Sequence, residues 1–157
     1  MILYHGSNIE IKDIDLSKSK VGKDFGCGFY LSADREQALE LARKKTEQVG
    51  FGTPIVNPFE YDEKASEVLN VLTFDAYTKE WAEFVLMNRK NRTRVQAHEY
   101  DIVIGPIAND AVGLQIRRLT SGLIDMEKFL NELKYMRGVT FQYFFANEKA
   151  INCLKRI

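Results

Sequence analysis

The sequence predicts an α+β fold in which short antiparallel strands, split into two sheets, lie around a cleft and are flanked by helices. The strand-like segments are short, and they mix with amphipathic helices without strict β–α alternation. With 157 residues the chain can bury a proper core, so we expect residues 1–157 to form one domain.

The first half of the chain should contain four strands and a helix. The predicted strands are Ile2–His5, Phe29–Ser32, Pro54–Tyr61 and Val68–Phe74. A polar segment through Asp24 separates the first two strands, and it is predicted to be a loop and a candidate lid over a ligand. The helix should begin after Asp34, a good N-cap residue, and end at Gly50. Its inner face would carry Ala38, Leu41, Ala42 and Lys45.

The second half should contain more helix than strand. Further strands are predicted over Asp101–Gly105 and Thr140–Ala146. Further helices are predicted from Asp75, from Asn109 through Arg118, from Asp125 to Gly138, and from Asn147 to the C-terminus. The aromatic stripe of the first of these helices is interpreted as core packing, because its spacing is that of a buried helix face.

Charge and cysteine content exclude several classes of protein. Lys and Arg together number 22, as do Asp and Glu, so nothing global attracts the chain to nucleic acid or an anionic membrane. The basic run from Arg89 to Arg94 is interpreted as a solvated helix end, with a phosphate-contacting loop as the alternative. Cys27 and Cys153 are expected to be free thiols, and two thiols with two histidines do not suggest a zinc site. Met1 leads directly into the first strand and no apolar stretch reaches membrane-spanning length, so we expect a cytoplasmic protein without a membrane partner.

Two short motifs carry the chemistry: Tyr4-His5-Gly6-Ser7, and the segment from Phe25 to Ser32. A histidine ring offers two nitrogens to a sugar hydroxyl. Gly6 leaves the backbone open to a planar amide, and Tyr30 offers a flat face for stacking. Together these groups would suit a nicotinamide riboside.

The two motifs, YHGS and GCGFYLSADREQALELA, are similar to the pattern of the polymerase-type branch of the ADP-ribosyltransferases. The fuller match resembles a small bacterial family of unknown function placed in that group. Its marks include YHGSNIEIKDIDLSKSK, DFGCGFYLS, EWAEFVLMNR, YDIVIGPIAND and QYFFANEKAI. The resemblance implies an ADP-ribosyltransferase-like fold with split antiparallel sheets around an NAD cleft.

The resemblance also implies roles for individual residues. His5 would bond the ribose of NAD, Gly6 the carboxamide, and Tyr30 would stack on nicotinamide. The third member of the His-Tyr-Glu triad falls on Gln142, which gives a His-Tyr-Gln triad. Further contacts to NAD are expected from Ser7, Gly28 and Ser32, although Ser7 and Ser32 could instead serve their own backbone turns. NAD would be a substrate, and no metal is expected.

Two departures from the family pattern shape the expected activity. Gln142 can accept a hydrogen bond but adds no charge and cannot act as a general base, so chain elongation is not expected. Transfer of a single ADP-ribose unit to an unknown protein or nucleic-acid acceptor, or hydrolysis of NAD, is expected instead. Ala38 and Leu41 stand where relatives have serine and tyrosine, which removes one amide contact and one stacking ring. By analogy alone, a toxin role with a neutralising partner protein would fit a small domain of this group.

Alternative functions remain open on the same residues. The uncharged Gln142 favours a weak or inactive module that binds NAD, ADP-ribose or a partner. Transfer of a phosphate from RNA to NAD would need basic residues around the cleft, which the sequence does not place. Glu99 and Glu148 are alternative acidic members, and the residues from Asp101 to Asp110 form a candidate second contact surface.

Overall fold

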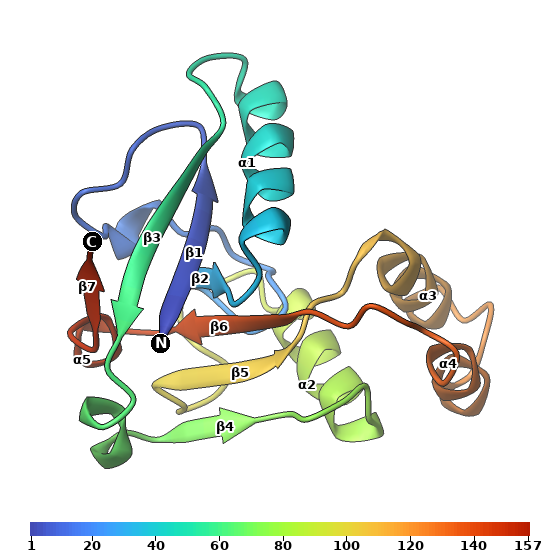
Figure 1. Ribbon diagram of the computed structural model, residues 1–157. Coiled ribbons are helices and arrows are strands. Elements are labelled where there is room, and N and C mark those ends of the chain that lie inside the picture. The colour runs from blue at the N-terminus through green and yellow to red at the C-terminus, as the bar shows by residue number, and fades with distance from the viewer.

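The computed structural model describes residues 1–157 as an α+β fold, with seven strands in one mixed sheet and five α-helices (Figure 1). The strands are β1 (Ile2–Ser7), β2 (Phe29–Ser32), β3 (Ile55–Tyr61), β4 (Val71–Thr73), β5 (Ile102–Pro106), β6 (Phe141–Phe145) and β7 (Leu154–Arg156). The α-helices are α1 (Arg35–Val49), α2 (Lys79–Lys90), α3 (Asp110–Thr120), α4 (Met126–Leu133) and α5 (Glu148–Ile151). Two 3₁₀ turns cover Leu16–Lys18 and Ala65–Val68.

The sheet has the order β4-β5-β6-β2-β1-β3-β7 and is weakest at its middle. Tyr4 opposite Ser32 is the single residue pair that joins β1 to β2, whereas β1 pairs with β3 along its whole length. The half containing β1 and β3 therefore runs in a different direction from the half containing β4, β5 and β6 (Figure 1). The prediction of two separate antiparallel sheets is thus wrong in detail, because β2 joins both halves. In addition, β4 and β5 are parallel, since α2 forms the crossover between them.

Side chains alternate across the sheet and build one core on each face. Val103 and Phe144 face the first core, where α2, α3 and α4 pack against β5 and β6. Their chain neighbours Ile102 and Phe145 face the second core. The second core also contains Leu3, Leu31, Phe59, Tyr61, Ala150 and Cys153.

Helix α1 packs on β1 through small residues. Asp34 caps the helix as predicted, accepting hydrogen bonds from the N–H groups of Glu36 and Gln37, and Gly50 ends it with a φ of 80°. Ala38 and Ala42 are fully buried. A Cβ atom on Gly6 would lie 2.0 Å from the carbonyl oxygen of Ala38, so only glycine lets the helix approach the strand this closely.

The predicted element boundaries are wrong where a turn or cap outweighs the apolar pattern. The helix expected from Asp75 begins at Lys79, because the Thr78 hydroxyl caps it by accepting from the N–H of Trp81. The strand expected over Val68–Phe74 is limited to Val71–Thr73, since Val68 completes a 3₁₀ turn.

The chain also ends differently from the prediction. The helix expected to reach Gly138 stops at Leu133. Asn147 caps the last helix as predicted, but α5 is only one turn long and the chain then forms β7. Leu154 pairs with Tyr61 of β3, so a free strand edge recruits residues that were expected to be helical.

Cys27 and Cys153 are both free thiols, and Cys153 is buried. None of the helices combines the length and the apolar character needed to cross a bilayer. No group of three or more His, Cys, Asp or Glu side chains is arranged to hold a metal ion.

Candidate functional site

The three residues of the expected triad lie on strands that are neighbours in the sheet. His5 is on β1, Tyr30 on β2 and Gln142 on β6. In the β2–β6 ladder Tyr30 is opposite Phe144 and Ser32 is opposite Gln142, so Tyr30 and Gln142 point to the same face. Segments separated by more than a hundred residues thus meet at the joint between the two halves of the sheet.

His5 lies where β1 separates from β2 and fills the gap with its side chain. Its Nδ1 is 2.7 Å from the carbonyl oxygen of Tyr30, and its ring stacks on Phe29 with a centroid separation of 4.4 Å. Because a carbonyl only accepts, Nδ1 carries the proton and Nε2 keeps its lone pair. Nε2 makes no hydrogen bond within the protein and is not among the fully buried polar atoms without a partner. No group of the protein therefore competes with a ligand for Nε2.

The environment of His5 keeps its imidazole neutral. Burial lowers the pKa of His5 to about 4, outweighing the hydrogen bond to Tyr30 that would raise it. The positive charges of Lys45 and Lys23 lower it further. At neutral pH this histidine is thus a hydrogen-bond acceptor at Nε2 and cannot act as a general acid.

Tyr30 is held by both its ring and its hydroxyl. The hydroxyl donates to the carbonyl of Gly26 at 2.6 Å and accepts from the N–H of Phe25 at 3.1 Å. Its burial raises the pKa of Tyr30 well above the ordinary value. The ring packs against Phe144, with 5.0 Å between centroids, and the Lys23 ammonium lies 5.4 Å from the ring centroid.

The imidazole of His5 and the ring of Tyr30 do not face each other. His5 stacks on Phe29, which packs against the second core, whereas Tyr30 packs against the first. Successive residues of a strand point to opposite faces, so the structure brings His5 to the backbone of Tyr30 but not to its ring. Lys23 lies near both, since it contacts the Tyr30 ring and its charge acts on His5.

Gln142 is the most available polar side chain of the three. It is half-buried, and its amide makes no hydrogen bond within the protein. The alternative acids are not beside it. Glu99 precedes β5 and Glu148 follows β6, and the ladder in which Ile102 pairs with Phe145 puts both near the end of β6 opposite to Gln142.

The other predicted NAD contacts have structural roles. A Cβ atom on Gly28 would lie 2.3 Å from the ring of Phe144, so packing against β6 already requires glycine there. Ser7 is completely buried, and its hydroxyl lies 3.5 Å from the side-chain oxygen of Asn8. The Ser32 hydroxyl accepts from the N–H of Asp34 at 3.0 Å, just before α1 begins.

Several backbone carbonyl groups of the segment from Phe25 to Ser32 each accept a hydrogen bond from a different side chain. His98 donates from Nε2 to the carbonyl of Phe25 at 2.7 Å, and its Nδ1 accepts from the N–H of Tyr100. Burial lowers the pKa of His98, in keeping with a neutral ring. The amide of Gln96 donates to the carbonyl of Cys27, as Tyr30 and His5 do to two others in this motif. These bonds fix the backbone on which the candidate site is built.

The basic run from Arg89 to Arg94 anchors the preceding loop. Arg89 pairs with Asp24 at 2.6 Å. Arg94 donates to the carbonyls of Ser19 and Leu16 at 2.7 and 3.1 Å. The interpretation of this run as a solvated helix end is therefore incomplete, since these two arginines fasten the segment that was expected to act as a lid.

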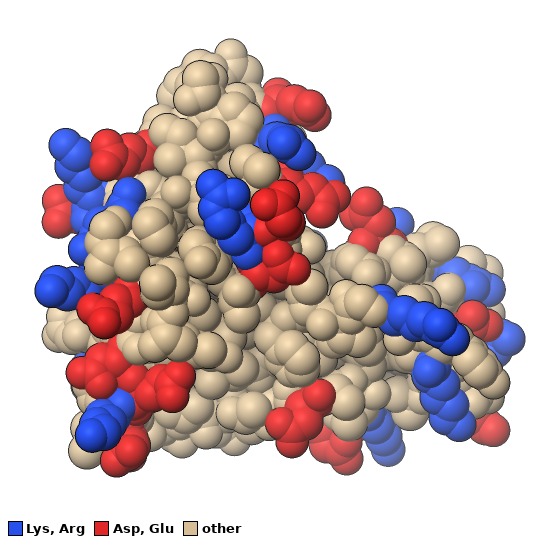
Figure 2. Space-filling view, in the orientation of Figure 1, with Lys and Arg blue, Asp and Glu red and all other residues tan.

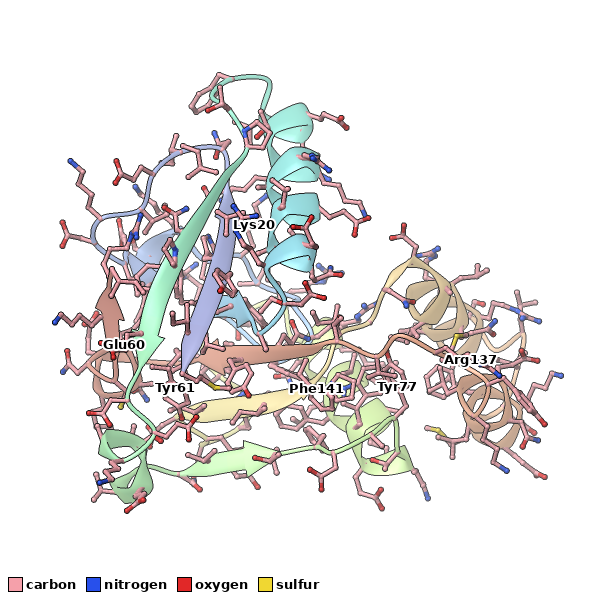
Figure 3. All side chains as sticks on the ribbon, in the orientation of Figure 1. Lys20, Glu60, Tyr61, Tyr77, Arg137 and Phe141 are labelled. Atoms are coloured by element: carbon pink, nitrogen blue, oxygen red, sulfur yellow. The ribbon has the colours of Figure 1, made fainter.

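Four lysines form a cluster in which Lys23 and Lys45 act on His5 while Lys18 and Lys20 act on Lys45, and the sequence does not predict this cluster as part of the site. Figure 3 shows Lys20 beside β1 and α1, and its charge acts on Lys45 of that helix. Loss of hydration lowers the pKa of Lys23 and of Lys45, and the neighbouring ammonium groups lower both further. None of the four makes an ion pair. One signal was present in the sequence: Lys45 lies two turns beyond Ala38 on the inner face of α1.

Asp101, at the start of the candidate second contact surface, is already engaged. Its carboxylate accepts from the Asn147 amide at 2.7 Å and from the N–H of Asn70 at 2.9 Å. Burial alone would raise the pKa of Asp101, but these hydrogen bonds and the nearby Lys149 outweigh it and lower the pKa. Asp101 therefore ties three segments together.

Two cavities of the surface lie elsewhere. One, of about 470 Å³, is lined by residues of β3 and β7 and by Met1. The other, of about 510 Å³, lies between the C-terminal turns of α2 and α3. Neither is lined by His5, Tyr30 or Gln142.

Comparison with known protein families gives one assignment. Residues 1–156 match the family described as Protein of unknown function (DUF3990), so the chain belongs to this family. A comparison with curated proteins gives no match.

Proposed function

We propose that this member of the DUF3990 family binds NAD at the separation of β1 and β2 and breaks its bond between nicotinamide and ribose. The ADP-ribose would pass to a single acceptor or to water. One observation carries the proposal: the two motifs that resemble ADP-ribosyltransferases meet at the hydrogen bond between His5 and the carbonyl of Tyr30. Gln142 comes from the strand on the other side of Tyr30, which is where the third triad member is expected.

His5 would position the ribose from one face of the sheet, and Gln142, which shares the face of Tyr30, would do so from the other, so the ribose would lie at the edge where β1 leaves β2. The unpaired Nε2 of the neutral His5 would accept a hydrogen bond from a ribose hydroxyl, while the free amide of Gln142 would orient the 2′-hydroxyl. As the glycosidic bond breaks, its electron pair leaves with nicotinamide and positive charge develops on the ribose. The acceptor, or water, then attacks the ribose carbon and loses its proton. With no carboxylate at Gln142, the reaction relies on positioning more than on charge stabilisation.

The lysines around His5 would serve the phosphates of the dinucleotide. None of Lys18, Lys20, Lys23 and Lys45 makes an ion pair, although Asp24 lies near Lys23, and the pyrophosphate of NAD would supply a direct partner. The Lys23 ammonium lies over the ring of Tyr30, so nicotinamide would stack there only after Lys23 swings away. A move of Lys23 toward the pyrophosphate would accomplish both.

The first test is release of nicotinamide from NAD at neutral pH by wild type and by His5→Asn. The asparagine amide can still donate to the carbonyl of Tyr30 but offers nothing at the position of Nε2. We expect release above the background in wild type and a loss of about 100-fold in the variant. Release at background level in wild type would contradict the enzymatic proposal.

The second test uses Gln142→Glu. A carboxylate at this position would stabilise the developing positive charge, so nicotinamide release should rise by at least about tenfold. Asn131→Asp adds the same charge on the exposed side of α4 and should leave the rate unchanged. Equal rates for both variants would remove Gln142 from the proposed site.

Two other functions keep specific support. The Lys23 ammonium on the Tyr30 ring favours a module that binds ADP-ribose without chemistry, and calorimetric binding of ADP-ribose without nicotinamide release would identify it. The lysines also supply the basic residues that phosphate transfer from RNA to NAD requires. Nicotinamide release that depends on added phosphorylated RNA would identify that reaction.

A further inference from the structure

A second basic feature lies apart from His5, in the groove between the C-terminal turns of α2 and α3. This groove has a volume of about 510 Å³, and four cationic side chains and no acidic one line it. The cations are Arg89, Lys90, Arg92 and Arg117. Leu86 and Ile116 are its apolar lining residues. The groove thus combines concentrated positive charge with apolar surface.

Helix electrostatics explain only part of this arrangement. Cationic side chains are favourable near helix C-termini, and the last turns of α2 and α3 both carry them. Two neighbouring arginines of α3 nevertheless differ in their contacts. Arg118 donates to the side chain of Gln115 and does not line the groove, whereas Arg117 lines it and makes no bond.

The cations in the groove are largely unpaired. Lys90, Arg92 and Arg117 are exposed, and none makes an ion pair or side-chain hydrogen bond within the protein. Arg89 alone is engaged, with Asp24. A groove that gathers three free cations without an acidic neighbour is built at an electrostatic cost, which an anionic ligand would offset.

The other cavity shows that this pattern is not general. It has a similar volume, about 470 Å³, but it is lined by Glu60, Asp62 and Glu63 together with two lysines. Figure 2 shows the same segregation on one face. Acidic side chains gather at the lower left, over the segment after β3, and basic ones gather on the right over α3 and α4. A net charge of zero therefore conceals a basic end of the molecule.

We infer that the groove between α2 and α3 binds single-stranded nucleic acid. Three of its four cations are arginines, whose planar guanidinium groups match phosphate oxygens in pairs. An extended strand alternates phosphates with sugars and bases, and these would pack on Leu86 and on the methylene stems of the lysine and arginine side chains, since Ile116 below them is buried. The inference does not depend on the proposed NAD chemistry.

The groove also reaches the loop that carries the lysines near His5. The guanidinium of Arg92 packs against Gly22, where a Cβ atom would lie 2.6 Å from its Nη1. Arg89 pairs with Asp24 of the same loop. A strand held in the groove would therefore pass beside Lys20 and Lys23.

The test measures binding of a fluorescein-labelled 12-nucleotide oligothymidylate by fluorescence anisotropy at salt concentrations from about 50 to 200 mM. Over this range, affinity falls measurably for each contact between a cationic side chain and a phosphate. We expect micromolar affinity at the lower salt concentration, within the range of non-specific binding. Lys90→Gln/Arg117→Gln removes two exposed cations that make no internal bond, so folding should be preserved. It should weaken binding by at least about tenfold and reduce the slope of log K against log salt by about 1.4.

The matched control is Lys64→Gln/Lys155→Gln, which removes two lysines from the other cavity. It changes the net charge equally and should leave both affinity and salt slope at the wild-type values. Equal losses in the two double variants, or no binding by wild type at 50 mM salt, would overturn the inference. So would competition by polyglutamate as effective as that of oligothymidylate at equal charge concentration, because it would assign the groove to acidic polypeptides.

Discussion

The half of the sheet containing β5 and β6 is packed with large side chains, whereas the half containing β1 and β3 meets its helix through small ones. Trp81 and Phe144 are completely buried in the first core. On the other side, Gly6 touches the backbone of α1 at Ala38 and Ala42. The first half therefore buries large apolar side chains against its helices, whereas the second half buries such side chains on its other face and meets α1 through close approach of backbones. Polar groups gather at the boundary, where neither kind of packing is complete.

The largest expected effect concerns the first half. Trp81→Ala should lower the free energy of unfolding by about 4 kcal/mol, because it leaves a large cavity and also removes the hydrogen bond from the indole to the carbonyl of Pro106. Leu3→Ala, at an equally buried position of β1, should cost about 3 kcal/mol. Urea denaturation of both variants measures the difference. A greater cost for Leu3→Ala would reverse the comparison between the two halves.

The next effect concerns the boundary and depends on pH. Because the pKa of His5 is about 4 in the folded protein and near 6.5 when unfolded, only the unfolded chain gains a proton as the pH first falls below 6.5. The stabilisation is complete above pH 6.5 and is lost between pH 6.5 and 4. It should amount to about 3 kcal/mol. His5→Asn should lack this part of the pH dependence, and parallel stability curves for the two proteins would contradict it.

A smaller effect should follow from filling the contact between β1 and α1. Gly6→Ala places a methyl group against the carbonyl of Ala38, so we expect a loss of about 2 kcal/mol in thermal or urea unfolding. The matched control is Gly113→Ala in α3, where the nearest atom to the added Cβ is the Arg117 guanidinium at 3.7 Å. That substitution should be neutral or stabilising by up to about 1 kcal/mol. The idea of backbone packing fails if the two substitutions have the same effect.

The smallest effect should be a local increase in hydrogen exchange in the loop between β1 and β2. Arg94→Gln removes the two hydrogen bonds to the carbonyls of Leu16 and Ser19. Hydrogen exchange in residues 16–19 should accelerate by about tenfold or less, as expected for the loss of about 1 kcal/mol, while the rest of the protein is unchanged. Arg92→Gln makes the same chemical change where no hydrogen bond is lost. Similar exchange in both variants would show that Arg94 does not hold the loop.

Much of the local structure could be predicted from the sequence, because caps and strand patterns are short-range effects. Asp34 and Asn147 cap helices where predicted. The two N-terminal strands are confirmed: β1 extends to Ser7 instead of His5, and β2 has the predicted bounds. The sequence predicts that the His5 imidazole and the Tyr30 ring share a site, whereas His5 contacts only the backbone carbonyl of Tyr30, at 2.7 Å.

The features that the sequence does not predict have a common physical cause, since each depends on residues far away in the chain. Residues after Asn152 become a strand only because β3 offers a free edge. The four lysines come from a loop and from α1, so no sequence pattern groups them. The groove depends on distant partners only in part, because Arg89, Lys90 and Arg92 form a basic run in the sequence and only Arg117 of α3 is brought to them by the fold.

The sequence by itself determined the type of fold, most helix caps and the residues on which an NAD hypothesis can be built, because these depend on neighbours a few positions apart. The tertiary structure alone decided that all strands join in one sheet and that β1 leaves β2 at His5. It also decided that the imidazole and the ring of Tyr30 lie on opposite faces. Those features depend on strand pairing and helix packing between residues that are distant in the sequence, so they are set only in the folded protein.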